Sequence, residues 1–113
     1  MLVIRDEQMH VFAEAFDARF FRDLVGWTRA AWFDQAVGRS DAVLERLLRE
    51  AASRAVSFGV TREDDVRAFV DLELRLGPGF EHKLPYALGV LRDATLSGGA
   101  KVALLQQRSS AAP

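Results

Sequence analysis

The sequence predicts an all-α fold, a single small bundle of four to five helices with a long first helix. Apolar residues recur at three- and four-residue intervals along most of the chain, which is the period of an amphipathic helix. Glycine, proline and helix-capping residues separate these runs, and no stretch of useful length alternates as a strand does. With 113 residues, half of them hydrophobic, the chain suits one domain with one modest core.

The first helix should run from about Asp6 to about Trp32. Its apolar stripe falls at four-residue steps and comprises Phe12, Phe16, Phe20 and Leu24. Gly26 lies inside this helix and weakens it by roughly 1 kcal/mol relative to alanine. We therefore expect a kink or close packing against a neighbour at Gly26.

The second helix should begin at a cap, Ser40 or Asp41, and end near Phe58. The connection before it, from Trp32 to Ser40, has room for one helical turn. The apolar face of the second helix comprises Leu44, Leu47, Leu48, Ala51, Ala55 and Phe58. Its other side carries two i,i+4 ion pairs in the favourable order, Glu45 with Arg49 and Glu50 with Arg54.

The third helix should run from Arg62 to Leu76. Gly59 before it is expected to be a helix C′ residue, because only glycine adopts the left-handed conformation at no steric cost. Thr61 should be the N-cap, with Asp64 completing a capping box. The acidic first turn consists of Glu63, Asp64 and Asp65, and the apolar face of Val66, Phe69, Val70 and Leu74. Gly77-Pro78-Gly79 ends the helix.

We expect the first and third helices to pack together. Six side chains should be buried in the core: Phe16, Phe20, Leu44, Leu48, Phe69 and Val70. The segment Gly77–Pro85 is the longest irregular stretch, and Pro85 can begin a short fourth helix that ends near Arg92. A last helix should cover about 100–107. Residues 1–108 form the expected helical domain, and residues 109–113 a flexible C-terminal tail.

Charge and composition exclude several classes of protein. The net charge is −1, so we expect no nucleic-acid partner and no membrane partner. The chain contains no cysteine, which excludes disulfides and thiolate chemistry. No stretch approaches the roughly 18 apolar residues of a membrane span, and the short run Met1–Ile4 lacks the features of a signal peptide. The expected location is the cytoplasm.

The sequence offers little that could carry out chemistry. His10 and His82 have no partners at a spacing typical of a metal or acid–base site, and both are expected at the surface. Gly77-Pro78-Gly79 lacks the Lys-Ser/Thr ending of a phosphate loop. Gly98-Gly99 with Lys101 could hold an anion at a helix N-terminus, but so small a pattern is common. We therefore predict no catalytic residue, no cofactor and no metal.

Aromatic side chains are the richest feature of the sequence. Most of them must belong to the core. Large aromatic residues also dominate the energetics of protein interfaces. The predicted partner-binding residues are Phe21, Trp32, Phe33, Phe80 and Tyr86. Phe80 stands out because it belongs to the long segment Gly77–Pro85, and such segments are often functional. Tyr86 stands out because it follows directly after Pro85.

Several segments resemble a group of short uncharacterised helical bacterial proteins that are encoded beside type VI secretion spike, PAAR-tip and effector genes. The segments are 4–9 (IRDEQM), 58–72 (FGVTREDDVRAFVDL), 76–80 (LGPGF) and 84–87 (LPYA). The resemblance implies an accessory role at a secretion locus, as an adaptor, chaperone or inhibitor of an effector or spike component. It transfers no catalytic residue.

Three functions remain open from the sequence, of which an enzyme ranks third and would need a pocket that joins His10 or His82 to a buried carboxylate. The first is a non-enzymatic module that binds another protein, with self-association also allowed. The second is an independent regulatory or nucleic-acid-binding helical domain, whose best basic face would comprise Arg46, Arg49 and Arg54. Glu45 and Glu50 interleave with those arginines, which favours the first function.

Overall fold

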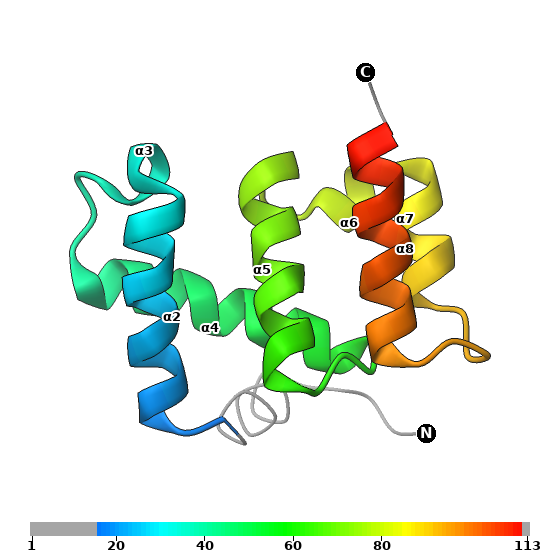
Figure 1. Cartoon of the computed structure of the whole chain (residues 1–113), viewed down its shortest axis with the longest axis horizontal. Helices are drawn as coiled ribbons and strands as arrows, with labels where there is room; N and C mark the ends of the chain where they lie inside the picture. Colours follow the sequence, from blue (N-terminus) through cyan, green and yellow to red (C-terminus); the bar gives the residue numbers. More distant parts are fainter. Residues whose placement is uncertain (1–15, 112–113) are drawn as a thin grey trace.

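The structure is a computed structural model that describes residues 16–111, without the side chains of residues 110 and 111. Within this part the chain is all-helical, with seven helices and no strand (Figure 1). The helices are α2 (Ala18–Ala31), α3 (Phe33–Ala36), α4 (Asp41–Ser57), α5 (Glu63–Leu76), α6 (Phe80–Lys83), α7 (Pro85–Leu91) and α8 (Gly98–Ala111). The helix count exceeds the expected four to five, because the short helices α3 and α6 occupy two of the connections. None of these helices is both long enough and apolar enough to cross a membrane.

A continuous first helix from Asp6 to Trp32 is wrong, because a new helix begins at Ala18. Asp17 is the N-cap, with an extended backbone (φ −76°, ψ 170°) and a side chain that accepts a hydrogen bond from the Phe20 N–H at 2.8 Å. Aspartate competes with the helical backbone for such hydrogen bonds, so it favours a cap over a helix interior. The residues before Phe16 lie outside the described part. Gly26 is exposed and has no close neighbour, so it marks no close packing.

Helix α4 is the platform on which the bundle is built. It crosses behind α2 and α5 in Figure 1, and both helices pack against it. The expected packing of the first helix on the third is therefore replaced by packing of each on α4. Small side chains make this close approach possible: Ala51, Ala52 and Ala55 of α4 are all buried. The six predicted core residues are buried as well, whereas Leu47, Phe58 and Leu74 of the predicted apolar faces are only half-buried.

The corner between α4 and α5 is a Schellman motif. Gly59 has a φ of +84° and donates its N–H to the Val56 carbonyl at 2.9 Å, while the Val60 N–H reaches the Ala55 carbonyl at 2.9 Å. The left-handed Gly59 confirms the prediction. The N-cap of α5 is Arg62 rather than Thr61, because the backbone stays extended through Arg62 (φ −84°, ψ 144°). The proposed capping box is therefore wrong, whereas the acidic first turn is confirmed.

The N-terminus of α8 lies directly on this corner. Lys101 is only 7% exposed, and its ammonium group donates to the Phe58 carbonyl at 2.7 Å. A cation on the last carbonyls of a helix satisfies acceptors that have no partner within the helix. Lys101 is thus engaged with α4 and is not aimed at an anion beside Gly98. A β-carbon on Gly98 would lie 2.5 Å from the Gly59 carbonyl oxygen, so this approach requires glycine.

The second half of the core lies between α5, α6, α7 and α8. Phe80 of α6 is fully buried and its ring lies 5.3 Å from that of Phe69. Pro85 is the first residue of α7, as predicted. The last helix is longer than expected and continues to Ala111, three residues into the segment predicted as a tail.

We predict that Gly98→Ala destabilises the protein by about 1–3 kcal/mol, because the new methyl group must displace the backbone at Gly59. Gly26→Ala is the matched control, since Gly26 is a helical glycine with open space around it. That variant should gain up to about 1 kcal/mol. Urea unfolding measures both changes, and equal effects at the two sites would contradict the close approach of α8 to the corner.

Candidate protein-binding site

A groove of about 280 Å³ lies between α3, α4 and α5. We call it the α4 groove, because α4 supplies most of its lining. Its apolar lining comprises Leu44, Leu47, Leu48, Ala51, Val70, Leu74 and Pro78, and its polar lining Gln35, Arg39, Glu50, Arg54 and Glu73. An apolar surface bordered by a few polar groups is the usual composition of a binding site.

The exposed large hydrophobic side chains belong to the same stretch of chain that supplies two lining residues of this groove. Phe33 is 63% exposed, Val37 56% and Val43 37%, and together they are the large hydrophobic residues that residues 16–111 leave exposed. All three fall within residues 33–43, the corner between α3 and α4, and two groove residues, Gln35 and Arg39, lie in the same segment. We call the α4 groove and these three side chains together the binding face.

Helix α3 is held in place on both sides. The Trp32 indole N–H donates to the Asp71 carboxylate at 2.9 Å, and the Gln35 amide donates to the Leu74 carbonyl at 2.5 Å. On the other side, the Arg29 guanidinium donates to the carbonyls of Ala36 at 3.3 Å and Arg39 at 2.9 Å. These bonds fix the wall of the groove and keep Phe33 pointing away from the core.

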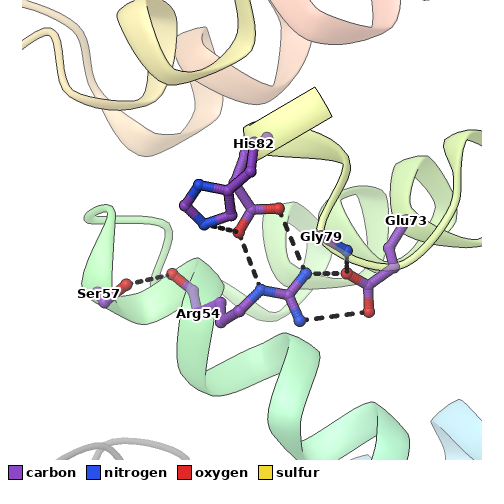
Figure 2. A network of polar contacts seen from close by, with 6 residues as sticks. Arg54, Ser57, Glu73, Gly79 and His82 are labelled. Carbon is purple, nitrogen blue, oxygen red and sulfur yellow. Dashed lines mark hydrogen bonds and ion pairs between the residues drawn. The ribbon is translucent and has the colours of Figure 1, made fainter. Parts of the chain in front are cut away.

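A network of charges that includes two residues of the groove lining, Arg54 and Glu73, joins α4, α5 and α6 (Figure 2). Arg54 of α4 donates to Glu73 of α5 and, at 2.9 Å, to Glu81 of α6. The Gly79 N–H also donates to the Glu73 carboxylate at 3.3 Å. Glu81 is only 1% exposed, so its charge depends on Arg54 for compensation. The expected i,i+4 pair of Glu50 with Arg54 is therefore wrong: Arg54 turns toward the two carboxylates inside the fold.

The structure separates the five predicted partner-binding residues. Phe33 is exposed, and Trp32 is half-buried beside the groove wall. Tyr86 is half-buried on the opposite side of the core, with the Arg108 guanidinium 5.4 Å from its ring centre. Phe21 and Phe80 are 0% exposed, so they are core residues and not available to a partner. Phe80 belongs to α6, a short helix within the segment expected to be irregular, and its ring is part of the core. Phe21 belongs to α2, and the Arg49 guanidinium lies over its ring, 4.1 Å from the ring centre.

The three arginines of the proposed basic face also have different surroundings in the structure. Arg49 pairs with Glu45 at 3.1 Å, Arg54 belongs to the network above, and Arg46 is left exposed. His82 is exposed as expected, and His10 lies outside the described residues. Within residues 16–111 no three His, Asp or Glu side chains are grouped so that they could hold a metal ion.

Comparisons with protein-family models, curated proteins and solved structures give no match to this chain. The binding face consequently stands on its own geometry. Of the five residues predicted from the sequence, Phe33 is exposed, and its role in binding stays a prediction; Val37, Val43 and the groove were not predicted. The signal for the groove is present in α4, where Val43, Leu47 and Glu50 follow one another at helical spacing beside the core face.

We predict that Arg54→Met destabilises the protein by about 3 kcal/mol, because it removes the guanidinium that binds the buried Glu81 carboxylate. The double variant Arg54→Met with Glu81→Met should recover most of this loss, since it removes both charges from the interior. Arg46→Met is the control and should be nearly neutral, because Arg46 is exposed. Guanidinium unfolding tests all three. A double variant as unstable as Arg54→Met would refute the compensation of Glu81 by Arg54.

Proposed function

We propose that the protein is a non-enzymatic helical module that binds another protein through the binding face. The observation that carries this proposal is that Phe33, Val37 and Val43 are exposed in the segment 33–43, which also borders an apolar groove through Gln35 and Arg39. Contiguous exposed apolar patches are uncommon on monomeric proteins and usually mark interaction sites, whereas single exposed hydrophobic residues need no explanation.

The energetics favour this face for binding. Fully burying a phenylalanine side chain contributes about 1.5–3 kcal/mol, and Phe33 has 63% of its surface still to bury. Helix α3 is already held by the bonds of Trp32 and Gln35. A partner therefore meets a surface that loses little conformational freedom on binding.

The resemblance of the sequence to short proteins encoded beside type VI secretion genes supports a more specific role. In this role the protein is an accessory adaptor, chaperone or inhibitor, and its client is a secreted effector or a component of the spike, including the PAAR tip. We place this activity in the cytoplasm, before the client is secreted. No cofactor, nucleic acid or membrane takes part in it.

Co-purification of the tagged protein with the products of its own locus tests the proposal. Phe33→Asp should reduce recovery of the client at least tenfold, equivalent to about 1.4 kcal/mol, because it replaces the most exposed large apolar side chain of the binding face by a charge. Ala103→Asp is the matched control, since it adds the same charge at an exposed position of α8. Both variants should keep the melting temperature of the wild type. Recovery of the client by Phe33→Asp at the level of the control would refute this binding face.

A further inference from the structure

We infer that the binding face also pairs with a second copy of itself, so that the free protein is a twofold dimer. In this dimer the Phe33 ring of each copy enters the α4 groove of the other. The inference rests on the proposed function, because it names a partner for the same face. A client must then displace the second copy in order to bind.

The groove is large enough for the ring. A buried apolar cavity of roughly 150 Å³ accommodates a benzene molecule. The α4 groove has about 280 Å³, so a phenyl ring fits with space for part of a neighbouring side chain such as Val37. Leu47 and Leu74 in its lining are only half-buried and would gain contacts with the ring. The side chain and the groove therefore match in both size and polarity.

The ring and the groove also lie close enough together for a symmetric interface. A twofold interface uses the same patch on both copies, so each contact occurs twice. Phe33 and Gln35 belong to the same four-residue helix, and Gln35 forms a wall of the groove. The segment 33–39 therefore carries the projecting side chain and, through Gln35 and Arg39, also borders the site that receives it. Had they lain on opposite faces, the contact would have produced an open chain of copies instead of a closed dimer.

The charges that line the groove are complementary under the same symmetry. Arg39 lies just before α4 and Glu50 more than two turns along it, about 14 Å away by the rise of the helix. Both side chains are exposed, and neither forms an ion pair within residues 16–111. A twofold axis between them brings Arg39 of each copy to Glu50 of the other. The net charge of −1 on each chain adds little repulsion.

Sedimentation equilibrium of the full chain tests the dimer. The wild type should be dimeric, and Phe33→Asp should weaken the dimer at least tenfold, equivalent to about 1.4 kcal/mol. Ala103→Asp should leave the dimer unchanged. Circular dichroism and melting temperature verify that the variants remain folded, which Phe33→Asp should be because its side chain is already exposed.

A charge exchange tests the pairing itself. Arg39→Glu alone and Glu50→Arg alone should each weaken the dimer at low salt, because each creates two pairs of like charges across the axis. The double variant should restore dimerisation, since the charges are then opposite again. A merely local effect of either residue would not produce this rescue, because the two positions are far apart within one chain.

Two results would overturn the inference. One is a wild-type chain that remains monomeric up to about 1 mM, where the association free energy would be weaker than about −4 kcal/mol. The other is a dimer that is insensitive to Phe33→Asp and to both charge reversals, which would place the interface elsewhere. Co-purification remains a separate readout: a monomeric protein whose client is lost in Phe33→Asp refutes the dimer alone, and a dimer without any client refutes the accessory role alone.

Discussion

The position of one guanidinium group determines how the two halves of the molecule meet. Arg54 of α4 contacts carboxylates from α5 and α6, and one of them, Glu81, is almost completely buried. Removing charges from water costs several kcal/mol per ion, so such a network contributes more to a unique arrangement than to net stability. Glu81 is bound by the Arg54 guanidinium, and the only other basic group that pairs with it within residues 16–111 is the imidazole of the exposed His82, 4.0 Å away, so α6 must lie where Arg54 can reach it. Phe80, the preceding residue, is thereby directed into the core against Phe69.

The same requirement fixes the groove. One end of the α4 groove is bounded by Arg54 and Glu73, and the other by α3, where Gln35 is bonded to the Leu74 carbonyl. Each of these two boundaries is therefore held by a polar contact to α5: the first by Arg54 with Glu73, and the second by Gln35 with the Leu74 carbonyl. At the far end of α4, Lys101 and the close approach of Gly98 lock α8 onto the Gly59 corner. Because α4 is held at both ends, a small shift of this helix cannot close the α4 groove, since close-packed interiors do not deform continuously.

The local features of this fold could be predicted from the sequence. Gly59, Ser40 and Pro85 each occupy positions that their own backbone or side-chain chemistry favours, and the structure confirms all three. The core faces of α2, α4 and α5 followed from periodicity. Asp17 shows the limit of that method, because the apolar stripe continues past it while its side chain favours a cap. An apolar stripe in the sequence predicts which residues are buried, but it does not show that they all belong to one continuous helix.

The failures at the candidate site have a common physical cause, which is distance along the chain. Glu50 is four residues from Arg54, whereas Glu81 is 27 residues away, and only the fold shows that the second carboxylate is reached. Phe80 looked exposed because no periodic neighbour could bury it, yet its partner is Phe69 on another helix. The groove itself is a gap between three helices, and no single segment encodes it.

The distribution of aromatic side chains explains why a binding face remains. Three aromatic side chains are fully buried where helices pack against one another: Phe21, Phe69 and Phe80. Phe33 is different because α3 contacts the rest of the fold through the buried Ala36 and through Gln35, while Phe33 stays 63% exposed. The side that carries Gln35 is bonded to α5, and the side that carries Phe33 is left facing solvent beside a groove that no described side chain fills. An apolar projection and an apolar groove on one rigid surface are stabilised only by contact with another chain, and that is the physical basis of both proposals.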